Sequence, residues 1–208
     1  MSSFVQAKAG LSSSGSPVTV AFASNVTAGN LLVAFGSTGS GSVTVTDTAG
    51  NVWTAVGSAP EFRAYYCKVA ASGPTSIQFA LSVPTNSLQW GIGEWVPPAN
   101  FVLDVSVFED TSCTTGFRFT PAGAGELAAL FAAAVSSSTA ALSGTGVVSR
   151  VNTSGIEAVG DILSTASGSN LVSLGSTGCC GGSLYGMGLV FKSGTTAPRD
   201  PIGFGAEA

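Results

Sequence analysis

The sequence predicts an all-β protein, an antiparallel β-sandwich of jelly-roll-like type built from two sequence-related halves. Three observations lead to this prediction. Short apolar or alternating runs recur about every ten residues, turn-forming Gly, Ser and Asn residues separate them, and a pattern in the first half returns in the second. Regularly spaced short strands with turn signals between them are typical of sandwiches and barrels.

The first half reads as a succession of strands. The segments expected to form them are rich in β-branched and aromatic residues or alternate between apolar and polar residues. They are residues 18–22, 31–35, 43–46, 52–54, 62–69, 77–81 and 90–96. In the second half, residues 126–135 have helical potential. We assign them to a strand because glycines flank them and because they match a strand of the first half.

An internal repeat relates the two halves. Residues 28–35 align with residues 124–131 at an offset of 96, and residues 90–93 align with residues 185–188 at an offset of 95. The second alignment pairs two Gly-x-Gly segments. Glycine inside a strand usually marks a close approach of another group, so we expect these glycines to leave room for an aromatic ring of the opposite sheet. The candidate rings are those of Trp53, Tyr65 and Phe79.

The repeats cover about residues 4–97 and 101–192, and a short proline-containing linker joins them. Two arrangements fit this organisation: tandem small sandwiches, or one sandwich with pseudo-two-fold symmetry. We favour a single sandwich over residues 1–192, because one double sheet would bury both Trp95 and Phe101.

The last residues of the chain differ from the rest. Residues 193–208 contain two prolines and show no strand alternation. We interpret them as an extended C-terminal arm, in which Phe204 anchors the arm on a neighbouring subunit. A frayed terminus is the alternative, since chain ends are commonly poorly ordered.

Charge is scarce in this chain. Charged residues make up 9% of it, against about 25% in typical soluble domains. A surface of Ser, Thr, Gly and Asn opposes association only weakly, which favours a subunit of a larger assembly. The seven basic residues are scattered, so no nucleic-acid partner is expected. The longest apolar run, residues 127–135, is too short to span a membrane, and the N-terminus has no signal-peptide pattern.

The four cysteines, Cys67, Cys113, Cys179 and Cys180, are compatible with disulfides or with free buried thiols. If all four pair, three connectivities exist. A bond between the adjacent Cys179 and Cys180 would be strained, so distant partners are favoured in the oxidised state. The chain has no His, and the Cys-Cys-Gly-Gly segment is not expected to bind zinc.

No catalytic, cofactor-binding or metal-binding residue is predicted, and the protein is not expected to be an enzyme. Without His there is no base for a nucleophilic triad. Glu94 is the best candidate for a catalytic carboxylate, but a glycosidase needs two. In the repeat alignment the position equivalent to Glu94 is occupied by Leu189. We interpret Glu94 as a sheet-edge or sheet-end carboxylate paired with Arg63 or water.

The segment from Asp47 to Asn51 is a weak candidate for calcium, which requires six to eight oxygen ligands. The same residues are the ordinary composition of a hairpin turn, in which the Asp side chain bonds to the backbone and Gly50 takes a positive φ. We favour the turn.

Aromatic residues are the candidate contacts for a partner subunit or a carbohydrate. Consecutive residues of a strand face opposite ways, so only one of Tyr65 and Tyr66 points inward. Core packing accounts for most of the aromatic side chains. Tyr66, Trp90 and Phe204 remain as the predicted contact residues.

Three segments, residues 26–33, 45–54 and 65–70, together resemble a duplicated, jelly-roll-like β-sandwich module. This module is found in bacterial extracellular proteins and in phage virion structural proteins. The resemblance extends to about residue 192. It implies a structural or adhesive role on a cell or virion surface and supplies no catalytic residues.

These observations favour a phage virion structural protein, with a capsid decoration (cement) protein as the first hypothesis. Its expected partners are sister subunits and the major capsid protein, and its expected location is the virion. The alternatives are a carbohydrate-binding or adhesin module of an extracellular or cell-surface protein, a tail or fibre component, and a subunit of an extracellular filament.

Overall fold

The computed structural model describes residues 1–194 apart from several short gaps, which are positions 14, 58, 85 and 167 and segments 113–115, 135–139, 154–156 and 176–182. Within this part of the chain there are sixteen strands in four antiparallel sheets. The described residues contain no helix that could cross a membrane. The all-β, antiparallel prediction is confirmed.

The first half forms a large and a small sheet. The large sheet has the order β1 (Ser3–Ser12), β8 (Leu88–Val96), β3 (Leu31–Thr38), β6 (Phe62–Lys68), β5 (Thr54–Val56). The small sheet has the order β2 (Val18–Ala21), β7 (Ser76–Leu81), β4 (Val43–Asp47). Together the two sheets form a sandwich around a core of their own, which includes Leu32, Ile77 and Phe79.

The second half repeats this plan. Its large sheet has the order β13 (Val148–Thr153), β14 (Glu157–Ile162), β11 (Leu127–Ala134), β16 (Ser183–Lys192), β9 (Val102–Ser112). Its small sheet has the order β10 (Gly116–Phe119), β15 (Asn170–Gly175), β12 (Ala141–Ser143). Strand β11 confirms the assignment of residues 126–135 to a strand. A core that includes Phe117, Leu130 and Val172 lies between the two sheets.

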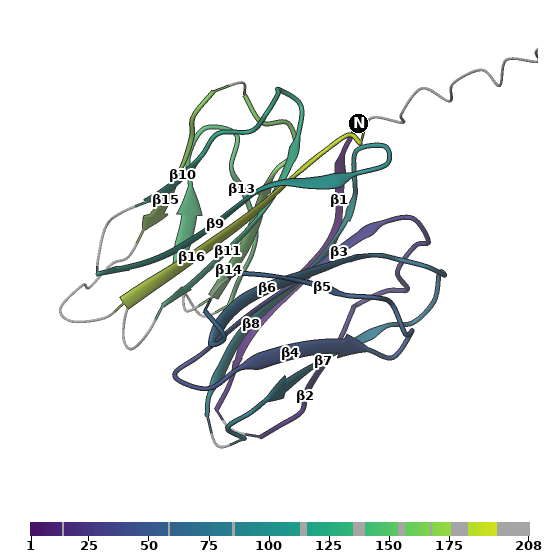
Figure 1. The fold of residues 1–208 in the computed structure, drawn as a ribbon, viewed down its shortest axis with the longest axis vertical. Coiled ribbons are helices and arrows are strands. Elements are labelled where there is room, and N and C mark those ends of the chain that lie inside the picture. Colours follow the sequence, from purple (N-terminus) through teal and green to yellow (C-terminus); the bar gives the residue numbers. More distant parts are fainter. Residues whose placement is uncertain are drawn as a thin grey trace, which may run out of the picture.

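The two halves stack through their large sheets, so that four layers follow one another (Figure 1). A third core, here called the shared core, lies between the large sheets and includes Leu31, Phe35, Phe131 and Leu189. Of the two arrangements that the repeat allowed, the structure has the tandem one, with a sandwich in each half. The physical reason is visible in β3 and β11, which are buried at every residue and therefore need a covering layer on both faces.

Strand register shows that the repeat offset is 96 residues in both central strand pairs. Leu31 pairs with Trp95 in the first half and Leu127 pairs with Phe191 in the second, so both partners are displaced by 96. The alignment of residues 90–93 at an offset of 95 is therefore wrong by one residue. A slip of one residue moves each side chain to the other face of the sheet. The structural counterpart of Glu94 is Val190, not Leu189.

A β-bulge recurs at the same place in both halves. In the first half the register shifts between Phe4 and Gln6, which pair with Trp95 and Glu94. In the second half it shifts between Leu103 and Val105, which pair with Phe191 and Val190, the counterparts of those two residues. Bulges tend to persist within a family because they re-aim a strand. Their shared position supports the internal duplication independently of sequence similarity.

The halves are related by an approximate two-fold axis. Phe35 and Phe131 are counterparts at the offset of 96, and their rings stack with centroids 5.3 Å apart and planes 6° apart. Self-contact of equivalent residues is the mark of a two-fold interface. The chain therefore contains, in one covalent unit, the arrangement that two copies of a smaller sandwich would form as a dimer.

The Gly-x-Gly segments do make room for aromatic rings, although for rings other than the three predicted. A Cβ at Gly91 would lie 2.7 Å from atoms of Phe131 and Val159, across the shared core. In the second half, Gly186 and Gly188 face the small sheet instead, and a Cβ there would lie within 3 Å of the Phe117 ring. The one-residue difference in alignment explains why the two segments face opposite cores.

We predict that Gly91→Ala destabilises the protein by about 1–3 kcal/mol, because the added methyl overpacks a shared core that is already filled by Phe131. Urea denaturation followed by intrinsic fluorescence measures the change. Gly39→Ala is the matched control, since a Cβ at Gly39 would meet nothing within 4 Å. Equal effects of the two substitutions would contradict the close approach described above.

Candidate functional site

The shared core ends in a polar cluster on the side where β1 lies against β13 and β14. Asp161 of β14 accepts a hydrogen bond from Trp95 Nε1 of β8 at 2.8 Å. Arg150 of β13 donates two further bonds to the same carboxylate, at 2.8 and 2.9 Å. The Arg150 guanidinium also lies over the Phe4 ring, 4.5 Å from its centroid. Each half thus contributes two of the four side chains.

This cluster links the two halves by hydrogen bonds and is not a reactive site. The Asp161 side chain is fully buried and the Arg150 side chain is 20% exposed. A buried carboxylate needs partners for its oxygens, and here three N–H groups supply them. The charge and the hydrogen-bonding capacity of the Asp161 carboxylate are therefore satisfied within the cluster, which favours a structural role.

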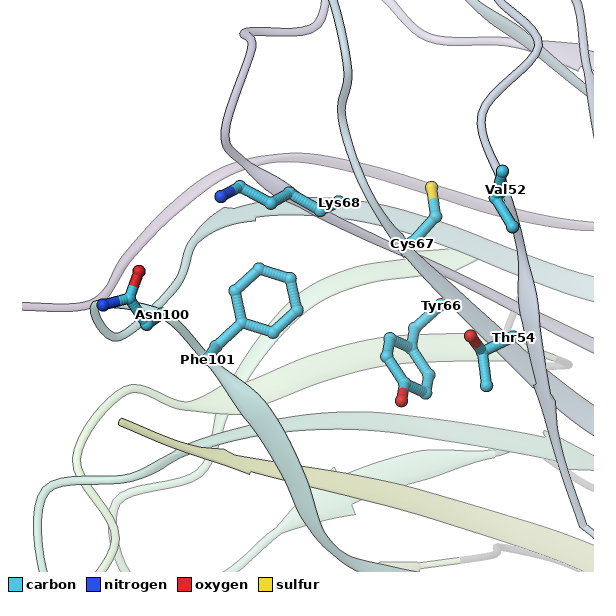
Figure 2. Close-up of a pocket in the computed structure, with 7 residues that line it drawn as sticks. All are labelled: Val52, Thr54, Tyr66, Cys67, Lys68, Asn100 and Phe101. Carbon is cyan, nitrogen blue, oxygen red and sulfur yellow. The ribbon is translucent and has the colours of Figure 1, made fainter. Parts of the chain in front are cut away.

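The opposite end of the shared core carries a pocket instead. Tyr66 occupies the position equivalent to Asp161, because Val33 pairs with Tyr66 and its counterpart Ala129 pairs with Asp161. Tyr66 packs edge-on against Phe191, the counterpart of Trp95, with ring centroids 5.2 Å apart. Beside these rings lies an open pocket of about 310 Å³, here called the Tyr66 pocket. Its lining residues, shown in Figure 2, are Val52, Thr54, Tyr66, Cys67, Lys68, Asn100 and Phe101.

The two ends differ because of one inserted residue. In β13, Ser149 pairs with Gly160 and Val151 pairs with Val159, so Arg150 is an additional, bulged residue. Its side chain fills the space beside Phe4 and Asp161. The equivalent strand β5 pairs with β6 without a bulge, and among the described residues β5 supplies no counterpart of the Arg150 side chain at the Tyr66 pocket.

The linker between the halves shapes one wall of the Tyr66 pocket. Asn100 has a φ of 49°, in the left-handed region that Asn tolerates better than most residues. The next residue, Phe101, packs edge-on against Phe191, with ring centroids 5.7 Å apart. Figure 2 shows the Phe101 and Tyr66 rings among the side chains that line the pocket. The sequence predicts Phe101 only as a core residue.

The predicted contact residues Tyr66 and Trp90 are not brought together. Tyr66 is half-buried and lies on the face of the large sheet that meets the second half. Trp90 is half-buried on the opposite face, beside the core of the first sandwich. Tyr65 and Tyr66 face opposite ways, as expected of consecutive strand residues, but the prediction that only one of them points inward is wrong, because Tyr65 belongs to the first-sandwich core and Tyr66 packs against the shared core. Phe204 lies outside the described residues.

The interpretation of Glu94 as a sheet-edge carboxylate paired with Arg63 is wrong. Glu94 lies in β8, between β1 and β3, and is fully buried. Its carboxylate accepts hydrogen bonds from Gln6 Nε2 at 2.7 Å, Thr27 N at 2.8 Å and Asn30 Nδ2 at 2.7 Å. These three donors come from distant parts of the sequence, so Glu94 fixes β1 and the turn before β3 to the sheet.

The segment from Asp47 to Asn51 forms the predicted turn. The Asp47 carboxylate accepts bonds from the backbone N–H groups of Ala49 and Asn51 and from the side chains of Asn51 and Trp53. Gly50 has a φ of 73°, as the turn requires. Both oxygens of Asp47 are thus occupied by N–H donors. Among the described residues, no group of three or more Cys, Asp or Glu side chains could hold a metal ion.

Cys67 has a free, buried thiol in the structure. Of the two states that the sequence allows for this residue, the free buried thiol is the one observed. Burial, with a smaller contribution from the nearby Asp47 charge, raises the pKa of the Cys67 thiol to about 12. The residues Cys113, Cys179 and Cys180 lie outside the described part of the chain.

Glu157 is a buried acid at the boundary between the halves. It begins β14, and a hydrogen bond links its carboxyl group to Gln89 of β8. Gln89 also donates from Nε2 to the Ala134 carbonyl of β11. Burial raises the pKa of Glu157 to about 7, although the Gln89 bond lowers it in part.

This pKa predicts a pH-dependent stability. The folded-state pKa of Glu157 lies above the ordinary value of 4.5, so the folded protein holds this proton more tightly than the unfolded chain does. The stability that Glu157 contributes is therefore fully present below pH 4.5 and is lost as the pH rises through 7. Glu157→Gln is expected to flatten the pH profile of the free energy of unfolding by about 2 kcal/mol between pH 4 and pH 8. Unfolding of both proteins in urea at several pH values measures it. Parallel pH profiles of the two proteins would contradict the prediction.

No protein-family model matches the chain, and no curated protein matches it. The surface, the Tyr66 pocket and the shared core are therefore the features that bear on function.

Proposed function

We propose that this protein is a phage virion structural protein, with capsid decoration as its role. It acts by burying its surfaces against sister subunits and the major capsid protein. The observation that carries the proposal is the scarcity of surface charge. Only 18 of the 208 residues are charged, and at least four of the acidic ones, Glu94, Glu126, Glu157 and Asp161, are buried. Such a surface has little repulsion to oppose assembly.

The edges of the large sheets supply a second argument. Strands β1 and β9 each have one strand neighbour among the described strands, so the backbone groups along their outer edges lack ladder pairing there, although the Ala9 carbonyl of β1 accepts a hydrogen bond from Thr153 Oγ1. Val5, Leu11 and Val102 on these strands are exposed. An exposed edge with apolar side chains is a template for a strand of another subunit. The shared core, in turn, keeps the two sandwiches in one orientation for such a contact.

The test is the oligomeric state over a wide concentration range, measured by light scattering coupled to size-exclusion chromatography. We expect assembly, most simply into a closed three-fold oligomer, that changes little with salt because few charges take part. Val102→Lys is expected to weaken it, whereas Leu171→Lys, an exposed position on the central strand β15, is not. A protein that stays monomeric at high concentration and does not bind capsids would refute the proposal.

A carbohydrate-binding or adhesin role on a cell surface is the second candidate. The Tyr66 pocket favours it, since aromatic rings there lie beside polar side chains such as those of Lys68 and Asn100. This role predicts selective binding on a glycan array that Tyr66→Ala abolishes. Trp90→Ala, on the opposite face of the same sheet, is the matched control. An array without selective binding would exclude this role.

A further inference from the structure

The Tyr66 pocket lies beside the last described residue of the chain. The Gly194 N–H donates to the Asn100 carbonyl at 3.0 Å, and Asn100 lines the pocket. Residues 195–208 follow Gly194 and lie outside the described residues. The C-terminal segment therefore starts at the rim of the pocket.

The Tyr66 pocket presents apolar surface with nothing packed on it in the described structure. Val52, which lines the pocket, is 88% exposed, the largest exposure of any described large hydrophobic side chain after Met1. At the pseudo-equivalent end of the shared core, the Arg150 side chain lies over the Phe4 ring and pairs with Asp161, the counterpart of Tyr66. A volume of about 310 Å³ is at the lower end of the range for ligand-sized pockets, roughly 300–1,000 Å³.

We propose that residues 195–208 dock into the Tyr66 pocket of their own chain, with Phe204 placed between Tyr66 and Phe101. Ten residues separate Gly194 from Phe204, and an extended chain of that length reaches at most about 36 Å, far more than the adjacent pocket requires. Attachment to the same chain gives the segment a millimolar effective concentration at the pocket. The pocket of the same chain is therefore favoured over that of a second copy.

The composition of the segment fits this occupant. Phe204 and Ile202 are its bulky apolar residues, and Pro198 and Pro201 restrict the unbound backbone, which lowers the entropy lost on docking. Asp200 and Glu207 flank Phe204 in the sequence. They carry the charge opposite to that of Lys68, which lines the pocket.

The test is a photo-crosslinking phenylalanine analogue at position 204 of the full chain, with adducts mapped by mass spectrometry. We expect an intramolecular adduct in monomeric protein, on the peptides that contain Val52, Tyr66 or Phe101, with a yield that dilution does not change. Val52→Asp should lower this yield about tenfold, because docking would bury a carboxylate. Val148→Asp, an exposed valine at the other end, should leave the yield unchanged.

Two results would overturn the proposal. One is an adduct confined to a crosslinked dimer that disappears on dilution, which would assign the segment to a second copy. The other is crosslinking that avoids the three pocket peptides or ignores Val52→Asp. The inference does not depend on the proposed virion role, because the adduct is measured in the isolated monomer whether or not the protein binds a capsid.

Discussion

Asp161→Ala is expected to destabilise the protein by about 3–5 kcal/mol, the usual cost of removing one partner from a buried ion pair. The carboxylate accepts hydrogen bonds from both Trp95 of the first half and Arg150 of the second. Its removal leaves the Trp95 N–H and the Arg150 guanidinium without their acceptor. Chemical denaturation of the purified variant measures the loss.

Lys192→Ala is the matched control for the Asp161 prediction. Lys192 pairs with Asp104, but its side chain is 40% exposed, and such pairs contribute about 0–1 kcal/mol. Asp161→Asn should give an intermediate loss, because the amide oxygen still accepts a hydrogen bond but the charge that balances Arg150 is gone. If Asp161→Ala costs no more than Lys192→Ala, the cluster does not hold the halves together.

Phe131→Ala is expected to cost about 3–5 kcal/mol, and Phe35→Ala a similar amount. Both rings are fully buried at the centre of the shared core, where they stack on each other across the approximate two-fold axis. Truncation of either ring leaves a cavity between two sheets that the remaining side chains cannot close. The free energy of unfolding in urea reports each loss.

The double variant distinguishes stacking from burial. Because the two rings touch, the losses should not add, and the coupling should be about 1 kcal/mol beyond area burial. Val52→Ala, at an exposed position, should change stability by less than about 0.5 kcal/mol. Strict additivity of the Phe35 and Phe131 losses would show that the halves do not meet at these rings.

Much of the architecture can be predicted from local patterns. Strand spacing and turn residues predict the all-β class, and the Asp47–Asn51 turn follows from the known roles of Asp and Gly in turns. The consecutive apolar residues of 31–35 also indicate a strand buried on both faces. Such a run does not show which sheets cover its two faces. For this reason the sequence alone favours a single sandwich over two stacked ones.

The one-residue error in the repeat has a similar origin. The sequence match between Gly91 and Gly186 is real as a pattern, but the side-chain positions are set by the pairing of β8 with β3 and of β16 with β11. The recurrent bulge beside Phe4 and Leu103 likewise depends on strand pairing and cannot be predicted from amino-acid composition. Register between distant strands therefore decides details that local periodicity does not.

The polar cluster and the Tyr66 pocket were the features least accessible to sequence reasoning. Trp95 and Asp161 are 66 residues apart, and Arg150 reaches them only because β13 contains a bulge. One signal was present: carboxylates at Glu157 and Asp161 stand in an otherwise apolar strand of a chain with few charges. Buried charges need partners, so this pattern predicts a partner without naming it.

The central claim is that the two sandwiches form one cooperative body through the shared core. Differential scanning calorimetry of the full chain tests it most directly. We predict a single transition whose calorimetric and van't Hoff enthalpies agree, and which shifts as a whole in Asp161→Ala and Phe131→Ala. Two separate transitions, of which these substitutions move only one, would contradict the claim.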